Sequence, residues 1–269
     1  QFYDWFAALA CDLVPYAEWC NSVGINLIQL LPVNDTGEES SPYGAKSAFA
    51  LNPIFIRLDD VPGVQSFKTD LKKSRESYNK NARVPYGELY RYKLEFLRSV
   101  FQKNFKTLTD NVELHKWIEH NSWIRTYSAY SFLKEQNGKK SWKEWSSSVN
   151  PTAKTIDTIW EKEWNAVMFF AWVQFIAEKQ FLSILPKLEP LNVKLKGDIP
   201  ILINEDSADV WGSRKYFDLN FRAGAPPDMF CYTGQNWGFP CYNWSALEKE
   251  DYSWWRMRLT QSSKFFHAI

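Results

Sequence analysis

The stretch NLIQLLPVNDTGEESSPYGAKSAFALNPIFIRL, residues 26–58, decides the fold of this chain. Its start, together with Ile25, places apolar side chains on both faces of a short segment that ends at Pro32. A strand buried on both faces and followed by a polar loop is typical of a parallel α/β sheet or barrel, where ligands bind at the carboxyl ends of the strands. An ordinary core strand with a long surface turn gives the same pattern, so the spacing alone leaves a binding role for the loop open.

Length and charge exclude several classes of protein. A chain of 269 residues is long enough for one large domain or two small ones. The formal net charge is +1 and no basic patch alternates with aromatic residues, so we expect no nucleic-acid partner. No run of about 18 apolar residues and no signal-peptide pattern occurs, so we expect no membrane partner and a cytoplasmic location. The chain begins with Gln1 rather than Met, as an internal cut of a longer polypeptide would.

The cysteine, histidine and aromatic residues indicate which kinds of site the chain can form. The four cysteines form no CxxC pair, and the simplest interpretation is reduced thiols. The three histidines are scattered, so we expect no metal site. Aromatic residues make up 17% of the chain. Most such rings fill cores, but rings also pack on the C–H faces of sugars, so their positions must separate the two uses.

The segments around the opening stretch predict helices packed on a sheet. Residues 3–22 have apolar groups near helical spacing, with Pro15 as a kink or boundary, and Gly24 marks the turn into the strand. Helix, turn and buried strand in this order form the second half of a βαβ unit. From about residue 63 to residue 190 helical patterns dominate, which predicts a helical insertion between two strands of the sheet.

Within this helical region the stretch with the mixed-charge segment 68–80 predicts a loop and a short helix. The pattern then predicts helices at residues 89–105, 112–118, 122–134 and 155–182. Tyr90 lies at the start of the helix at residues 89–105, where its ring points either into the core or towards a cleft, and the core is favoured. The last helix carries an apolar stripe, which is typical of a core-facing side: Trp160, Trp164, Met168, Trp172, Phe175 and Phe181.

The second strand of the sheet is predicted at residues 193–204, VKLKGDIPILIN. Asp198 lies inside this apolar run, and a carboxylate there is costly unless it is hydrogen-bonded or functional. Asp198 is therefore the most suggestive acid in the chain. Asp206 and Ser207 follow the strand, and an N-cap of the next helical turn is an equally good interpretation of them.

Residues 223–244, AGAPPDMFCYTGQNWGFPCYNW, predict an irregular loop rich in glycine, proline and aromatic residues. Too few apolar residues alternate for a regular strand, and two consecutive prolines exclude a helix. Long loops are often functional, although a packed Ω-loop is the alternative. The loop offers hydrogen-bonding groups and rings suited to gripping a sugar: Asp228, Tyr232, Gln235, Asn236 and Trp237.

Five motifs occur in an order that resembles glycoside hydrolase family 77, the amylomaltases or 4-α-glucanotransferases. They are QLLPVNDTG, SPYGAKSAFALNP, VPYGELYRYK, KGDIPILINEDSADVW and AGAPPDMFCYTGQNWGFPCYNW. The resemblance covers essentially the whole chain. It implies an α/β fold, an incomplete (β/α)8 TIM barrel of about strands 2 to 4 with a large, mostly helical insertion. It also implies transfer of α-1,4-glucan segments by a retaining mechanism that needs no cofactor.

The resemblance implies a role for particular residues. Tyr43, with Ser41 beside it, matches the tyrosine that lines the subsite next to the scissile bond. Tyr90 matches a glucan-binding tyrosine, and Asp198 matches an acid that faces the active centre. Asp228, Gln235 and Trp237 belong to the loop that closes over the glucan chain. Met229 and Cys231 depart from the tyrosine and serine common in that loop, which puts its hydrogen bonds in doubt.

The catalytic carboxylates of the family are not among these residues. In the family, the strand that ends here at Ile269 continues into Arg-Ile-Asp-His, whose aspartate is the nucleophile, and the other two acids come later. We therefore expect barrel segments at residues 1–62 and 191–269 around an insertion at residues 63–190. The expected partners are α-1,4-glucans and the remaining C-terminal part of the same barrel, and this stretch alone is expected to be inactive.

Two other classes of function stay open on sequence. A non-catalytic maltodextrin- or starch-binding protein would keep the aromatic loop without transfer activity. An α-amylase-type hydrolase would release reducing sugar from maltotriose, whereas a transferase redistributes it into glucose and longer oligomers. A purely structural helical protein leaves Asp198 and the Gln235–Trp237 segment unexplained.

Overall fold

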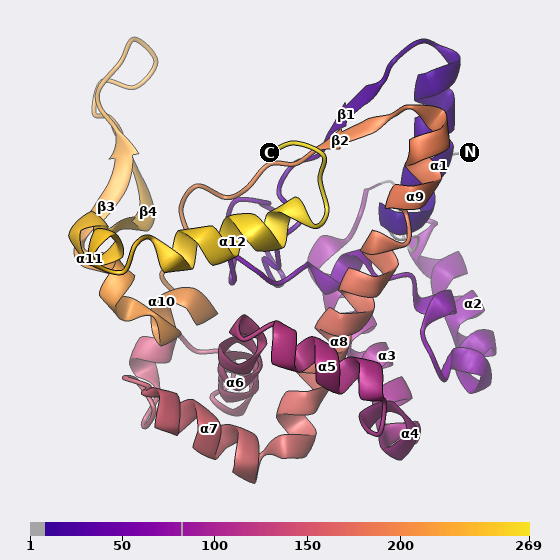
Figure 1. The fold of residues 1–269 in the computed structure, drawn as a ribbon, viewed down its shortest axis with the longest axis horizontal. Coiled ribbons are helices and arrows are strands. Elements are labelled where there is room, and N and C mark those ends of the chain that lie inside the picture. The colour runs from indigo at the N-terminus through magenta and orange to yellow at the C-terminus, as the bar shows by residue number, and fades with distance from the viewer. Residues whose placement is uncertain (1–8, 82) are drawn as a thin grey trace.

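The computed structural model describes residues 9–81 and 83–269, in which a mainly helical body carries two small two-stranded sheets at its periphery (Figure 1). The strands are β1 (Leu27–Gln29), β2 (Lys194–Lys196), β3 (Phe217–Ala225) and β4 (Gln235–Tyr242). The helices, in chain order, are α1 (Leu9–Ser22), α2 (Lys68–Tyr78), α3 (Tyr86–Lys103), α4 (Phe105–Thr109), α5 (Val112–His120), α6 (Trp123–Gln136), α7 (Ala153–Lys162), α8 (Trp164–Leu182), α9 (Leu185–Leu188), α10 (Ala208–Gly212), α11 (Trp244–Lys249) and α12 (Ser253–Ser263).

Three chain segments meet in parallel at the first sheet. β1 pairs with β2 in the register Leu27↔Lys194 to Gln29↔Lys196, and Lys196 forms a parallel bridge with Ala268. Directly after β1, the amide of Leu30 donates to the carbonyl of Lys196, the last residue of β2, at 2.9 Å. The predicted parallel arrangement of the two segments is therefore present, with the helical stretch of the chain lying between them in sequence.

The strands are shorter and more exposed than the sequence predicts. The prediction that the first strand is buried on both faces is wrong for the described residues, because Ile28 is 6% exposed whereas Leu27 is 50% and Leu31 57% exposed. The second strand ends at Lys196 rather than continuing to residue 204. One face of the sheet packs on the core, and no described segment covers the other.

Helix α8 forms the centre of the core. Its residues are buried around most of its circumference, as expected for a helix that is apolar on all sides. Trp172 lies against Phe101 and Phe169, with ring centroids 5.3 and 6.5 Å away. By length and composition Trp164–Leu191 could cross a membrane, but 78% of its most apolar window is buried inside the protein. Its apolar character is therefore explained by the core.

The single helix predicted for residues 155–182 is wrong. Glu163 takes non-helical angles, φ −115° and ψ 29°, and separates α7 from α8. The two helices run in different directions (Figure 1), because α7 packs along α6, where the Trp160 indole donates to the Arg125 carbonyl. Trp164 begins α8 at the break and is partly exposed, whereas the other members of the predicted stripe are buried.

Side chains from two helices form hydrogen bonds with the backbone of the second half of the opening stretch. The Gln174 amide group donates to the Leu51 carbonyl and accepts from its N–H, both at 2.8 Å. Gln180 makes the same pair of bonds with Arg57. The buried Lys93 ammonium donates to the carbonyls of Ile54 and Ile56. Since buried backbone groups need partners, these bonds, together with the antiparallel bridge between Asn34 and Leu51, hold the segment next to α3 and α8.

The prediction of an irregular loop at residues 223–244 holds for residues 226–234 but is wrong for the strand residues on either side of them. β3 and β4 form an antiparallel hairpin in which Phe217 pairs with Tyr242 and Ala225 with Gln235. The ladder is broken twice, so apolar residues do not alternate along the sequence and the strand signal is lost. Gly224 is required in it, because a Cβ there would lie 1.9 Å from the Gln235 carbonyl oxygen. The hairpin projects away from the rest of the chain (Figure 1).

Candidate functional site

Two loops meet at the carboxyl ends of β1 and β2. The Tyr43 hydroxyl, from the loop after β1, donates to Asp198 Oδ2 at 3.3 Å. Asp198 lies in irregular chain just beyond β2 rather than inside a strand, which corrects the predicted placement. Desolvation and the charge of Asp198 raise the pKa of Tyr43, so its hydroxyl stays a donor near neutral pH. This carboxylate and phenol share an open face, where ligands of parallel α/β folds bind.

Backbone bonds fix the loop that carries Ser41 and Tyr43. The Asn204 amide donates to the Ala45 carbonyl at 3.3 Å, and the Ala208 amide donates to the Lys46 carbonyl at 2.9 Å. The loop after β1 is thereby tied to the chain that follows β2. Ser41 is exposed at a turn closed by the Gly44 amide, which donates to the Ser41 carbonyl. Ser41 and Tyr43 are therefore exposed to solvent, while the loop backbone that follows them is fixed by hydrogen bonds.

The buried carboxylate of Asp35 fixes the same loop through hydrogen bonds. This residue was not singled out from the sequence. Its carboxylate is 3% exposed. Oδ1 accepts from the Gly37 amide at 2.8 Å and from the Tyr90 hydroxyl at 3.2 Å, while Oδ2 accepts from the Tyr127 hydroxyl at 2.7 Å. Burial, and then the charge of Asp35, raise the pKa of both tyrosines well above 10, so both remain donors.

Tyr90 lies in the core, as the sequence pattern favours. It is buried on α3, and its hydroxyl is engaged by Asp35. Its ring also lines a cavity of about 400 Å³ between α3 and α6, together with Tyr127 and Tyr130. The structure does not bring Tyr90 into contact with Tyr43 or Asp198, so its glucan-binding role stays a prediction.

The hairpin carries the other predicted site residues. Asp228 Oδ1 accepts from the amides of Phe230 and Cys231 at 2.8 and 2.7 Å, so this carboxylate shapes the turn at the tip. The exposed Trp237 indole donates to Gln235 Oε1 at 2.9 Å. No hydrogen bond among the described residues joins this tip to Tyr43 or Asp198. The predicted site residues thus form two separate groups, one at the strand ends and one on the hairpin.

A second buried acid, Asp209, connects the loop after β1 to α10, and it too was missed by sequence reasoning. Its Oδ2 accepts from the Ala48 amide at 2.7 Å. Ser207, the N-cap of α10, accepts from the Val210 amide and confirms the predicted cap. Burial raises the pKa of Asp209 to about 6, an effect that the Ala48 amide and the Arg258 charge only partly offset.

Stability should depend on pH through Asp209. The native state keeps the Asp209 proton up to about pH 6, whereas the unfolded chain releases it near the ordinary value of 3.8. Relative to Asp209→Asn, whose amide oxygen still accepts from Ala48, the wild type should lose on the order of 3 kcal/mol of unfolding free energy between pH 3.5 and pH 7. Urea unfolding of both proteins across this range measures the difference, and parallel pH profiles would contradict the assignment.

Within residues 9–81 and 83–269 no group of three or more His, Cys, Asp or Glu side chains could hold a metal ion. Cys20, Cys231 and Cys241 are free thiols, in agreement with the predicted reduced state of these three residues.

The fold is shared with solved amylomaltases. The amylomaltase from Streptococcus agalactiae, solved with acarbose, matches 95% of this chain and 53% of its own at a TM-score of 0.81 and 22% identity. The amylomaltase from Corynebacterium glutamicum matches 97% of this chain and 37% of its own at a TM-score of 0.78 and 19% identity. At these identities the likeness establishes the class of fold, which is that of part of an amylomaltase.

Sequence comparison identifies the family. The model of the 4-alpha-glucanotransferase family matches residues 7–269. The 4-alpha-glucanotransferase of Chlamydia pneumoniae is 36% identical over 95% of this chain and 49% of its own length. That of Aquifex aeolicus is 33% identical over 94% of this chain and 53% of its own. The chain therefore belongs to glycoside hydrolase family 77, as its motifs predict, and it spans about half the length of these relatives.

Proposed function

We propose that this chain forms the N-terminal part of a 4-α-glucanotransferase that transfers α-1,4-glucan segments between maltodextrin or starch-derived acceptors. The observation that carries the proposal is the Tyr43–Asp198 contact, which places a donor and a carboxylate at the carboxyl ends of neighbouring parallel strands. Membership of family 77, and the acarbose complex of the streptococcal amylomaltase, support α-1,4-glucans as the substrate class.

In this proposal, catalysis is divided between this chain and the segment that follows it. A retaining mechanism uses a carboxylate nucleophile and an acid/base carboxyl group about 5 to 5.5 Å apart. These two groups suffice to transfer the glucan segment from donor to acceptor, so the reaction needs no metal or cofactor. Both groups would come from sequence beyond Ile269, starting with the Arg-Ile-Asp-His motif of the family. Ser41, Tyr43 and Asp198 would bind sugar hydroxyls beside the scissile bond, while Trp237, supported by Gln235, would stack on the chain.

The proposed architecture is an incomplete (β/α)8 barrel. β1, β2 and the segment around Ala268 would be strands two to four, with the helices of residues 63–190 as an insertion. The exposed Leu27, Leu31 and Ile201 support this proposal, because barrel strands are normally buried on both faces. The C-terminal part of the same barrel would cover them. A cytoplasmic location belongs to the same proposal.

Removing either sugar-facing ring should weaken glucan use. In the full-length protein, Tyr43→Ala and Trp237→Ala should each lower kcat/KM for maltotriose by about tenfold, since a lost aromatic contact is worth roughly 1 kcal/mol beyond its area. Tyr16→Ala on α1 is the matched control, because this ring is 47% exposed against 45% for Tyr43 and 50% for Trp237. Unchanged kinetics in the first two variants would reject the assigned roles.

A further inference from the structure

The β3–β4 hairpin is irregular on both sides of one residue, Arg222. Asp218 pairs with Cys241, and the next pair is Arg222 with Pro240. Residues 219–221 of β3 therefore have no paired residue on β4. Beyond Arg222 the next pair is Gly224 with Asn236, which leaves residues 237–239 facing a single residue of β3. Bulges bend a strand and redirect its side chains, and they are enriched next to active sites.

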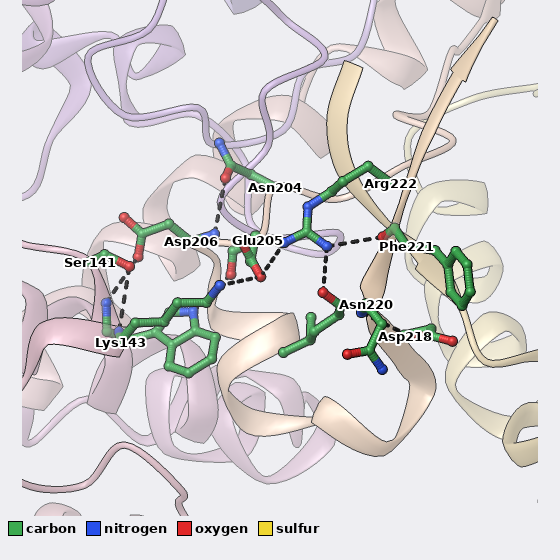
Figure 2. A network of polar contacts seen from close by, with 11 residues as sticks. Ser141, Lys143, Asn204, Glu205, Asp206, Asp218, Asn220, Phe221 and Arg222 are labelled. Carbon is green, nitrogen blue, oxygen red and sulfur yellow. Dashed lines mark hydrogen bonds and ion pairs between the residues drawn. The ribbon is translucent and has the colours of Figure 1, made fainter. Parts of the chain in front are cut away.

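The Arg222 guanidinium closes the first bulge and fastens it to a neighbouring segment. Nη1 donates to the Leu219 carbonyl at 2.7 Å and to the Phe221 carbonyl at 3.0 Å. Nη2 donates to Glu205 Oε1 at 2.8 Å. Figure 2 shows the guanidinium lying between the bulge and Glu205. One rigid planar group thus reaches two backbone carbonyls and a carboxylate, a geometry that lysine cannot reproduce.

Glu205 is held firmly from the other side. Lys143 also pairs with its Oε1 (Figure 2). The Trp142 indole donates to the Glu205 carbonyl at 2.8 Å. The next residue, Asp206, accepts from the Tyr130 hydroxyl at 2.8 Å and pairs with Lys134 of α6. The segment at Glu205 is therefore fixed by the helical region of the chain, and Arg222 connects the hairpin to it.

Trp237 lies close to this bend. It lies in the second irregular stretch, next to Gly238, which has a φ of +77°. The hairpin base is held by the Tyr242 hydroxyl, which donates to the Ile201 carbonyl at 2.7 Å, and by the Asn243 amide, which donates to the Tyr216 carbonyl. Between this base and the exposed tip, the Arg222–Glu205 pair is the attachment nearest to Trp237 along the hairpin. Its side chains are only 25% and 21% exposed, so solvent screens it less than a surface pair.

We propose that Arg222 is a positioning residue, which, through Glu205 and the bulge, aims Trp237 at the face that carries Tyr43 and Asp198. The kinetic part of this inference rests on the proposed glucan transfer, whereas the structural part does not. Loss of the attachment should leave the chemistry intact and reduce the fraction of molecules whose hairpin is placed to bind glucan.

Hydrogen exchange and kinetics of the full-length protein test the proposal together. In Arg222→Met, the ladder amides next to the two irregular stretches, those of Arg222, Gly224, Ala225, Gln235, Asn236 and Cys241, should exchange about tenfold faster, with α8 unchanged, because hydrogen bonds to a charged group are lost. KM for maltotriose should rise about tenfold while kcat stays within about twofold, since only binding is affected. Arg222→Lys keeps the positive charge but loses the planar guanidinium that bonds several acceptors at once. Its exchange rates and KM should lie between those of wild type and Arg222→Met.

A control variant at another ion pair, and substitutes for Arg222→Met, complete the test. Arg98→Met removes another partly exposed ion pair, that with Glu135, and should change neither hairpin exchange nor KM. If Arg222→Met fails to fold, Arg222→Lys and Glu205→Gln take its place. Unchanged hairpin exchange overturns the proposal, and so does faster exchange with an unchanged KM. If the wild type transfers no glucan, the proposed function fails, and hairpin exchange alone then decides whether Arg222 fixes the hairpin.

Discussion

Replacing Asp35 with alanine is expected to lower the free energy of unfolding by about 4 kcal/mol. The carboxylate is buried and accepts from the Gly37 amide and from the Tyr90 and Tyr127 hydroxyls. Its removal leaves three buried donors without their acceptor, and each unsatisfied donor costs about 1–3 kcal/mol. Chemical denaturation followed by circular dichroism measures the change.

Single-hydroxyl variants separate the Asp35 network into its parts. Tyr90→Phe and Tyr127→Phe each remove one donor together with its need for an acceptor, so each should cost only about 1 kcal/mol. Asp60→Ala is the surface control, because the Asp60 side chain is 58% exposed in its pair with Arg57. A loss below about 1 kcal/mol for Asp35→Ala would mean that the three donors find other partners, and the anchoring role of Asp35 would be wrong.

Replacing Asp198 with alanine should have the largest effect on activity. In the full-length protein, kcat for glucan transfer should fall about 100- to 1,000-fold, as when a preorganised polar group is removed from a reaction centre. The physical reason is its place beyond the end of β2, beside the Tyr43 hydroxyl, where it can bind sugar hydroxyls as charge develops. Steady-state kinetics with maltotriose provide the measurement.

Asp218→Ala is the matched control for this variant. Asp218 is also a partly buried carboxylate after β2, but on the hairpin its Oδ1 accepts from the Asn220 amide. Its loss should change kcat less than about threefold, because it touches neither Tyr43 nor the strand ends. Equal losses for the two variants would show that Asp198 acts through folding rather than through the substrate.

The parts of the fold that follow local rules could be predicted from sequence. The pairing of β1 with β2, the short helix α2, and helices α3, α5 and α6 follow apolar periodicity and turn residues. Gly138, with a φ of +62°, ends α6 where the Asn137-Gly138 signal places the end. The break at Glu163 was missed because the apolar period continues through it, and only packing of α7 on α6 requires a new direction.

The candidate site was predicted less completely, and for a physical reason. Tyr43 and Asp198 were predicted as site residues because each stands out in its motif, and the structure brings the two side chains together, although their role stays a prediction. Asp35, Asp209 and Arg222 carry no such local signal, since their partners lie far away in sequence, such as Tyr127 for Asp35 and Glu205 for Arg222. The hairpin was missed because its two bulges erase the alternation by which strands are recognised.

Incubating the full-length protein with maltotriose, and resolving the products by chromatography, tests the central claim most directly. A 4-α-glucanotransferase redistributes the sugar into glucose and longer maltooligosaccharides while the total number of reducing ends stays constant, and this is the predicted result. Net release of reducing sugar would identify a hydrolase of the α-amylase type instead. Binding of maltotriose without any new product would identify a glucan-binding protein, and either outcome would contradict the proposed function.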